Sequence, residues 1–462
     1  MPVVAVYEEP SCQQNVQPYR WKWTPARIYH WVLSFSIPAY VMWRYASNQY
    51  STFLVEQMPD GFKKSPYGLQ KQQDVMNWGW QTTKYVITNT WQWYLLHPVL
   101  GRLTAYAAPS YMFPRYGLMP YRAAFVAFHW NLMRGHSFSL DFVRAERQNQ
   151  WGHSRRRWPP YWQSLAYFVY LPTVYLGPPQ NYDDYVAQLN KTRPTCTPRI
   201  VAGAIARLLR SAAHFFLMEI MIHFFYSAAM SHWSWMAHSL DLFSLVGYGM
   251  SLLFLFYVRY LFTYGFAGAL ANAEGIEVPP HSPCIARMHR CSHFWRYFDR
   301  GMHKWIRRYI YEPVLGGSRR AHRLILGTAV AFTFTWVWHS MHGHDGIWCA
   351  LSVLGIVLEV ITTEVMKWAP IKKFQGRYLA SSERMREAKA LLGSPHFLLT
   401  ISACIFHLAE LDLSLVIVRR ILTGFPFPLV PILVVLYSTS HVSMDVADWE
   451  AAAVAKHKQA AS

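Results

Sequence analysis

Residues 324–341 read LILGTAVAFTFTWVWHSM, an apolar run whose only ionisable side chain, His339, lies near its end. Residues 347–366, IWCALSVLGIVLEVITTEVM, follow after a few residues and are almost as apolar. A helix that crosses the hydrocarbon core of a bilayer needs about 20 mostly apolar residues. The two runs therefore predict a pair of membrane-spanning helices joined by a tight turn.

Basic side chains flank this pair: Arg319, Arg320 and Arg323 before the first run, and Lys367, Lys372, Lys373 and Arg377 after the second. Positively charged flanks favour the cytosolic side of a membrane, so the turn at 339–345 is predicted on the opposite side. His339 follows Arg320 by roughly 29 Å of helix, at about 1.5 Å per residue. We therefore expect His339 deep in the membrane or at its far face.

Similar runs recur along the 462 residues. The candidate spans are 28–45, 85–107, 122–132, 161–176, 204–230, 237–266, 324–341, 347–366, 395–415 and 425–442. The run 122–132 is short for a span and suggests a re-entrant segment. We expect an all-α, polytopic integral membrane protein with about 10–12 transmembrane and re-entrant helices. It would form one membrane domain, with N-terminal helices in 1–160, a core in 161–448 and an exposed tail in 449–462.

The composition agrees with this class. Charged residues make up 15% of the chain, against roughly 25% in soluble domains. The formal net charge is +19, which in a soluble protein would indicate nucleic-acid binding. Here the basic residues lie between apolar runs, which favours anionic lipid or a polyphosphate such as coenzyme A as the partner and excludes nucleic acid. The six cysteines include no CxxC pair, so neither a zinc pattern nor a disulfide framework is indicated.

Two residues are candidates for chemistry. His339 ends an apolar helix, and ionisable groups inside spans are costly and tend to be functional, although a helix-capping role would explain it equally well. With His342, His344 and Asp345 it could also belong to a metal-binding loop. Asp299 is one acidic residue in a very basic amphipathic stretch, 288–323, where a salt bridge to a neighbouring arginine is the alternative.

Several segments resemble a known superfamily. They are WRYFDRG at 295–301, YIYEP at 309–313, Trp338-His339, GI at 275–276, PCI at 283–285, YLP at 170–172, GP at 177–178 with Asp183, and YSTSHV at 437–442. Together they look like the membrane-bound O-acyltransferase superfamily, and within it the Hedgehog acyltransferase branch. The resemblance is strong over 275–348, moderate over 165–442 and weak before that. The interval between Asp299 and His339 is the one that this resemblance leads us to expect.

The resemblance implies roles for individual residues. His339 and Asp299 would be the catalytic pair, and Cys284 would be the thiolate that ligates the iron of haem b. The alternative for Cys284 is a small buried apolar residue. The family usually has glycine directly after the catalytic histidine, whereas this chain has Ser340 and a His342-Gly343 pair three residues on. His342 is therefore the alternative catalytic histidine.

The resemblance also implies an activity, which is the transfer of palmitate from palmitoyl-CoA to the N-terminal cysteine α-amine of a secreted Hedgehog-type protein. Trp295 and Arg296 would bind the donor, through its acyl chain or thioester and its phosphates. The endoplasmic reticulum membrane, or the Golgi, is the expected location. The alternatives are an acyltransferase of the same superfamily that acts on a lipid or other hydroxyl, and a catalytically silent relative. A transporter finds no support in the resemblance.

Overall fold

Helices make up almost all of the regular structure in the described part of the chain. The computed structural model describes residues 22–100, 118–149, 159–189, 191, 197–284, 289–339 and 341–461. Within that part, the only strands are β1 (Phe62–Lys63) and β2 (Gln73–Asp74), which pair as a short antiparallel ribbon. Five of the described helices are long and apolar enough to cross a membrane, namely Ile200–Phe224, Leu242–Ala273, Gly343–Val365, Ser382–Leu408 and Leu429–Ala453. The predicted all-α membrane class is confirmed.

The first half of the chain contains α1 (Pro25–Ala46), α2 (Tyr50–Gln57), η1 (Pro59–Gly61), α3 (Trp78–Leu100), α5 (Leu118–Asn149), α6 (Tyr161–Phe168), α7 (Leu171–Val174), α8 (Tyr182–Leu189), α9 (Pro198–Phe224), α10 (Ser227–Met230), α11 (Ser234–Ser239) and α12 (Leu242–Ala273). The second half contains α13 (Cys291–Tyr297), α14 (Arg300–Ile306), η3 (Arg307–Tyr311), α15 (Glu312–Leu315), α16 (Ala321–Trp338), α17 (Gly343–Val365), α18 (Ala369–Tyr378), α19 (Ser382–Leu408), α20 (Leu411–Thr423) and α21 (Leu429–Ala461).

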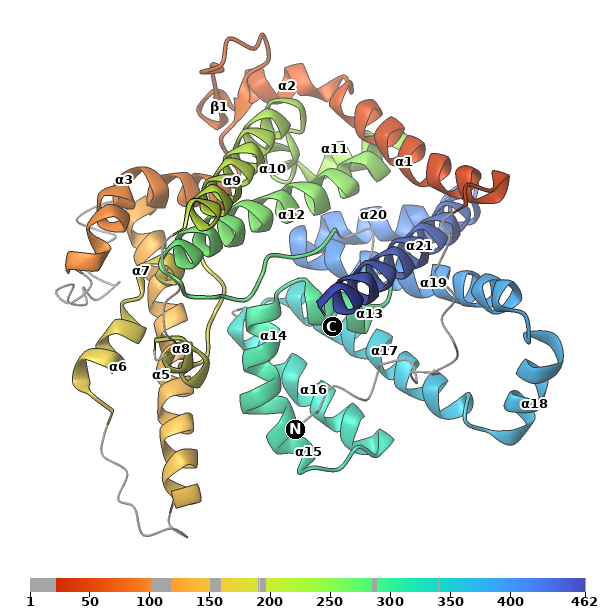
Figure 1. Cartoon of the computed structure of the whole chain (residues 1–462). Helices are drawn as coiled ribbons and strands as arrows, with labels where there is room; N and C mark the ends of the chain where they lie inside the picture. Colours follow the sequence, from red (N-terminus) through yellow and green to blue (C-terminus); the bar gives the residue numbers. More distant parts are fainter. Residues whose placement is uncertain are drawn as a thin grey trace.

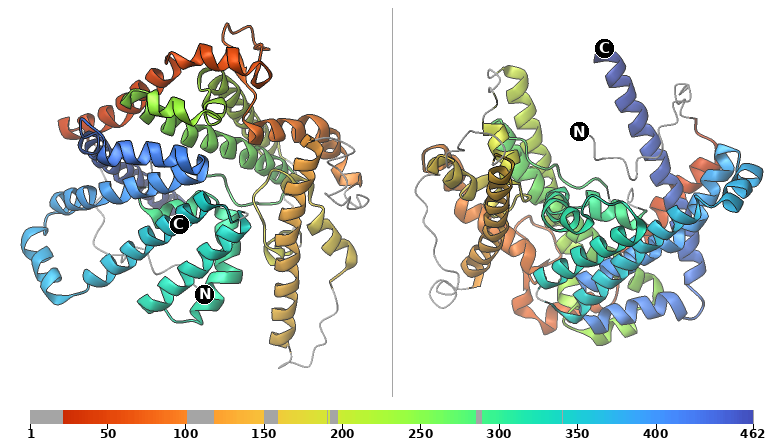
Figure 2. Two further views of the ribbon diagram at one scale, coloured as in Figure 1. Left: turned by 180° about the vertical axis from the view of Figure 1, so that it is seen from behind. Right: turned by 90° about the horizontal axis from the view of Figure 1, so that it is seen from below.

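Helix α12 is the central element of the bundle, with α9, α1 and α19 packed against it (Figure 1). Close contact between α1 and α12 depends on Gly247, because a Cβ there would lie 2.0 Å from the carbonyl oxygen of Val41. Helix α19 in turn packs between α17 and α21, and α16 pairs with α17. Figure 2 shows from two further sides that α3 and α5–α8 gather at one side of the bundle, away from α18–α21. The short helix α13 contacts α14 and the long helices α17 and α19.

Some predicted spans differ from the structure. The run 161–176 does not form one helix, because α6 ends at Phe168 and α7 begins at Leu171, where Pro172 can occupy only a first helical turn. The run 122–132 lies inside the 32-residue α5, so it is not a short re-entrant segment. Part of the run 85–107 falls outside the described residues. Helix α21 continues to Ala461, so the predicted tail is helical over its described part.

The predicted helix pair is present, with α16 ending at Trp338 and α17 beginning at Gly343. Helix α17 meets the length and hydropathy expected of a span, whereas α16 is not among the five helices that do. The reason lies in the 18 residues of α16, which include His322 and Arg323 at the start. Because α16 is so short, these polar residues lower the mean hydropathy of the whole helix.

Candidate active site

Asp299 lies at the break between α13 and α14, where its carboxylate caps the second helix. Oδ1 accepts a hydrogen bond from the backbone N–H of Met302 at 2.9 Å. Such a cap satisfies one of the amide groups that a helix N-terminus leaves free. Oδ2 accepts from the hydroxyl of Tyr264 on α12 at 2.5 Å. The carboxylate is thus held from two sides by groups on different elements.

Gly301 explains why this break can be so tightly packed. A Cβ at this position would lie 2.6 Å from the carbonyl oxygen of Pro179 and 3.0 Å from the Cβ of Pro178. Only glycine permits that approach between α14 and the segment that follows α7. Gly301 and the segment 177–179 therefore pack directly against each other, and this contact fixes the start of α14.

The sequence left a salt bridge to a neighbouring arginine as the alternative role of Asp299. Among the ion pairs of the described residues none involves Asp299, although several arginines lie close by in sequence. Burial raises the pKa of the Asp299 carboxyl, and the hydrogen bonds from Tyr264 and Met302 oppose that effect. The result is an enclosed carboxyl that takes up a proton more readily than an exposed aspartate.

His339 directly follows the last residue of α16 and lines a large cavity. Its backbone N–H closes the helix by donating to the carbonyl of Thr335 at 3.0 Å. Its ring lies edge-on to two neighbours, Trp348 at 5.1 Å and His407 at 5.0 Å between ring centroids. The helix-capping role and the exposure of the side chain to the cavity thus coexist in the same residue.

His342, the alternative histidine, is placed differently. It is exposed, precedes the first turn of α17 and stacks on His344 with 5.5 Å between ring centroids. Its carbonyl accepts a hydrogen bond from the indole N–H of Trp336 at 3.0 Å. It is not among the described residues that line the cavity. Of the two histidines, His339 lines the cavity and His342 does not.

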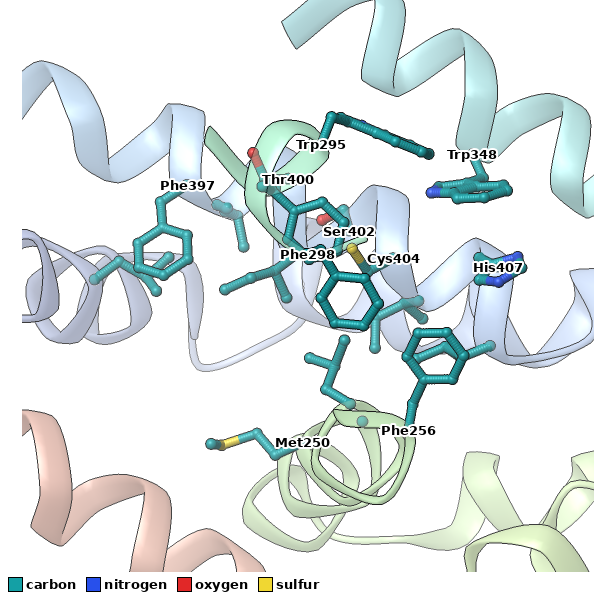
Figure 3. A pocket seen from close by; sticks show the side chains of 18 of the residues that line it. Met250, Phe256, Trp295, Phe298, Trp348, Phe397, Thr400, Ser402, Cys404 and His407 are labelled. Atoms are coloured by element: carbon teal, nitrogen blue, oxygen red, sulfur yellow. The ribbon is translucent and has the colours of Figure 1, made fainter. Parts of the chain in front are cut away.

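The cavity has a volume of about 1180 Å³ and lies between α1, α12, α13, α14, α16, α19 and α21. Asp299 and His339 both line it, although no hydrogen bond or ion pair of the described structure joins the two side chains. Its walls are mainly aliphatic and aromatic (Figure 3). The ring of Trp295 lies between those of Phe332 and Trp348. The distance between ring centroids is 4.5 Å to Phe332, which is perpendicular to it, and 5.0 Å to Trp348. A long apolar chain would find continuous hydrocarbon contact here.

Positive charge gathers at one part of the wall. Arg296, Arg307 and Arg319 line the cavity there. Arg307 and Arg319 share one carboxylate, Glu312, at 3.1 Å each. Burial lowers the pKa of nearby His303 to about 4, so that imidazole is neutral near pH 7. Guanidinium groups at a cavity wall suit an anionic group.

His407 is a residue of the site that the sequence did not reveal. Its Nδ1 lies 2.9 Å from Oδ1 of Asp345, and its ring stacks on Trp348 at 3.9 Å between centroids (Figure 3). Nitrogen and oxygen atoms of His339, Asp345 and His407 all lie within 4.8 Å of one another, an arrangement that could hold a metal ion. The possible metal site in the structure therefore contains His339 and Asp345 of the predicted loop, with His407 in place of His342 and His344. His407 comes from α19, 62 residues after Asp345, and no local motif marks it.

Cys284 is exposed and lines the same cavity, whereas Cys291, Cys349 and Cys404 are buried. Burial raises the pKa of the Cys291 thiol, which disfavours the thiolate that a metal requires. An accessible thiol beside a large apolar space is placed as a thiolate ligand of haem iron would need to be.

Comparison with known proteins gives one matching family. The model of the membrane-bound O-acyltransferase family matches residues 40–386. "Protein-cysteine N-palmitoyltransferase HHAT" of Mus musculus is 28% identical over 284 residues, 61% of this chain and 56% of that protein. "Protein-cysteine N-palmitoyltransferase Rasp" of Drosophila melanogaster is 28% identical over 270 residues, 58% of this chain and 51% of that protein.

A third relative is named for a different activity. "Membrane-bound O-acyltransferase GUP1" of Saccharomyces cerevisiae is 25% identical over 272 residues, 52% of this chain and 46% of that protein. The chain thus spans about half the length of each of these relatives. The match begins inside α1 and ends inside α19, so it includes Cys284, Asp299 and His339, whereas His407 lies beyond it.

Proposed function

The chain belongs to the membrane-bound O-acyltransferase family, and on that premise we propose that it transfers palmitate from palmitoyl-CoA to the α-amine of the N-terminal cysteine of a secreted Hedgehog-type protein. The observation that carries the proposal is the mainly apolar cavity of about 1180 Å³ that holds His339 and Asp299. Ligand pockets typically measure about 300–1,000 Å³, so this one has room for a long acyl chain and part of a second substrate. The two relatives named as protein-cysteine N-palmitoyltransferases support the acceptor.

We propose that the acyl chain of palmitoyl-CoA lies against the aromatic side chains of the cavity wall. Trp295 packs against the chain or the thioester, since it stands between Phe332 and Trp348. Arg296 and the neighbouring Arg307 and Arg319 pair with the phosphates of coenzyme A, for which guanidinium groups are well suited. The basic stretch is predicted on the cytosolic side, where coenzyme A is made.

His339 is proposed as the general base. The neutral amine attacks the thioester carbonyl, the C–N bond forms, and the imidazole accepts the proton that the nitrogen loses. The C–S bond then breaks, and the same proton passes to the sulfur of coenzyme A. Asp299, enclosed and held by Tyr264, stabilises the positive charge that His339 carries in between. The released products are an amide and a thiol.

Cys284 is proposed to hold the iron of haem b. Acyl transfer from a thioester has no redox step, so the haem would stabilise or regulate the protein. The thiol supports this proposal by its exposure at the cavity wall. Because the acyl donor is cytosolic and the acceptor secreted, we expect the protein in the endoplasmic reticulum membrane or the Golgi.

A second candidate is O-acylation of a lipid or other hydroxyl, which the similarity to GUP1 favours. An assay with each acceptor in turn separates the two. Purified protein would receive labelled palmitoyl-CoA with a peptide that carries an N-terminal Hedgehog sequence, and separately with lysophospholipid or diacylglycerol. Label in the peptide alone supports the proposal. Label in the lipid alone would replace it with the second candidate, and no label in either would indicate a catalytically silent relative.

A further inference from the structure

The membrane-spanning helix α17 carries an acidic side chain, Glu359, on a face that is turned into the protein. Its side chain is 12% exposed, whereas Leu358 and Ile361 on the same helix are exposed. Ionisable groups inside a span are costly and tend to be paired or functional. Glu359 is not among the described residues that line the large cavity, so its role depends on the residues that it binds.

Glu359 caps the short helix α13 from a different helix. Helix α13 begins at Cys291, and its own N-cap residue, Arg290, makes no side-chain cap hydrogen bond. Instead, one carboxylate oxygen of Glu359, Oε1, accepts from the backbone N–H of Ser292 at 2.9 Å, and the other accepts from the Ser292 hydroxyl. A carboxylate in this position satisfies an amide that the helix leaves free and lies at the positive end of the helix dipole. Because seven residues do not form a stable helix by themselves, the start of α13 depends on such contacts.

Helix α19 supports the same carboxylate. Nε2 of His396 lies 2.9 Å from Oε1 of Glu359 and 3.2 Å from the backbone nitrogen of Cys291. On α17, Gly355 lies about one turn before Glu359, and a Cβ there would be 3.0 Å from both the Cβ and the Sγ of Cys291. The first turn of α13 is therefore held closely between α17 and α19, with Glu359 at the junction.

The last turn of α13 carries side chains that face the large cavity. Trp295 and Arg296 both line it, and they are the residues proposed above to contact the acyl chain or thioester and the phosphates of the donor. Ser292 lines the cavity as well, so Glu359 lies directly behind this part of the wall. Seven helical residues span roughly 10 Å, so a shift of the first turn would also move the side chains of the last.

The candidate catalytic pair is held independently of this cap. The Asp299 carboxylate is bound by Tyr264 on α12 and by the backbone N–H of Met302. The start of α14 packs against Pro179, and His339 follows another helix, α16. Loss of the α13 cap should therefore affect the donor-binding side chains more than the catalytic pair.

We propose that Glu359 is a positioning residue for the acyl-CoA donor, which caps α13 and so holds Trp295 and Arg296 in the orientation that binds palmitoyl-CoA. Glu359 acts through Ser292 and does not contact the substrate. The inference rests on the proposed function for the identity of the donor. It assigns Glu359 an effect on donor affinity that is separate from acceptor binding and from the chemical step.

The test measures kcat and both KM values for the full-length protein in nanodiscs, with palmitoyl-CoA and the Hedgehog peptide. Equilibrium binding of labelled palmitoyl-CoA is measured alongside, without any acceptor. Glu359→Ala should raise the KM and the Kd for palmitoyl-CoA on the order of fivefold, the factor that corresponds to loss of a helix cap. The kcat and the KM for the peptide should stay within about twofold of wild type. Glu359→Gln should restore most of the donor affinity, because its amide oxygen can still accept from the Ser292 N–H.

Glu364→Ala is the matched control on the same helix. Glu364 is exposed and pairs with Lys367 at 2.6 Å, so its removal should leave all three kinetic values and the Kd as in wild type. If Glu359→Ala does not fold, Glu359→Asp takes its place with the same expectation, because its carboxylate is withdrawn from Ser292 by one methylene group.

Two results would overturn the proposal. Unchanged donor affinity in the Glu359 variants, at equal amounts of folded protein, would remove Glu359 from donor binding. A lower kcat together with a rise in both KM values and a lower Tm, not restored by Glu359→Gln, would make Glu359 a structural residue only. If the wild type binds palmitoyl-CoA but labels no peptide, the proposed acceptor fails, and the binding measurement still decides the role of Glu359.

Discussion

At the level of single residues, two histidines three positions apart have different surroundings. His339 lines the large cavity, whereas His342 is exposed and stacks on His344. Spacing and the preceding Trp338 suggested His339 from sequence, but the serine that replaces the usual glycine kept His342 as an alternative. The difference in burial gives a physical reason for choosing between them.

His339→Gln should abolish acyl transfer while the protein still inserts and purifies. General-base catalysis contributes about 10²–10⁴-fold, so the loss should be at least about 100-fold. His342→Gln should remain within about threefold of wild type, because an exposed side chain that touches no substrate costs little. Both variants would be measured with labelled palmitoyl-CoA at equal amounts of folded protein. An inactive His342→Gln beside an active His339→Gln would reverse the assignment.

Asp299→Asn separates the charge of this residue from its capping role. Asparagine caps a helix about as well as aspartate, so the Tm should change little. Activity should fall, because a neutral amide cannot stabilise a protonated His339. Asp299→Ala should lose activity and also about 1 kcal/mol of stability with the cap. Transfer rates that match wild type in Asp299→Asn would limit Asp299 to a structural role.

Cys284→Ala tests the haem proposal. Wild-type protein, made with ample haem, should show a haem absorption band that Cys284→Ala lacks. Cys291→Ala should keep the band, since Cys291 is buried and its thiol Sγ lies 3.5 Å from the carbonyl of Ser352. Any activity that Cys284→Ala loses should parallel its loss of folded protein. A colourless wild type would return Cys284 to an ordinary cysteine.

Asp299, His339 and Cys284 could be proposed from the sequence because each lies in a local motif that resembles a family, and all three line one cavity. The sequence could not identify His407 or Tyr264, whose partners are 62 and 35 residues away and belong to other helices. Their roles depend on which faces of α19 and α12 turn toward the cavity. That is decided by packing between helices, and no single segment encodes it.

At the level of elements, the break between α13 and α14 positions the candidate catalytic carboxylate. Gly301→Ala should push α14 away from Pro179, because the new Cβ would lie 2.6 Å from a backbone oxygen that cannot yield cheaply. Overpacking of this kind costs about 1–3 kcal/mol and should displace Asp299. Thermal unfolding and acyl transfer would both be measured, and both should fall.

Gly376→Ala is the matched control for Gly301→Ala. Gly376 lies inside α18, and a Cβ there would meet nothing within 4 Å. Alanine is favoured over glycine inside a helix by about 1 kcal/mol, so stability should hold or rise slightly. Equal behaviour of the two variants would show that the contact with Pro179 does not constrain α14.

Hydropathy predicted elements well where a helix is continuous and poorly where it breaks. The runs 324–341 and 347–366 correspond to α16 and α17 within a few residues. The run 161–176 is apolar enough for a helix, but Leu171-Pro172 begins a new one and the chain turns there. A window average cannot register such a break, since a single proline hardly changes its mean.

At the level of the whole molecule, the cavity joins parts of the chain that are far apart in sequence. Its walls include Ile37 on α1 and Val435 on α21, together with α12 and α13 between them. Composition and charge predicted one helical membrane domain with basic segments between its apolar runs. They could not predict a cavity, because its shape arises from contacts between α1, α12, α19 and α21 that only the folded bundle defines.

The central claim is that this bundle joins the acyl group to an α-amine, and the chemical nature of the product bond tests it most directly. Wild-type protein would be incubated with palmitoyl-CoA and the Hedgehog peptide, with either a free or an acetylated amino terminus, and the products analysed by mass spectrometry before and after hydroxylamine. We expect a hydroxylamine-resistant palmitoyl group on the first residue of the free peptide and no product from the acetylated one. A hydroxylamine-labile product on the acetylated peptide would contradict this expectation and would make the cysteine sulfur the acceptor.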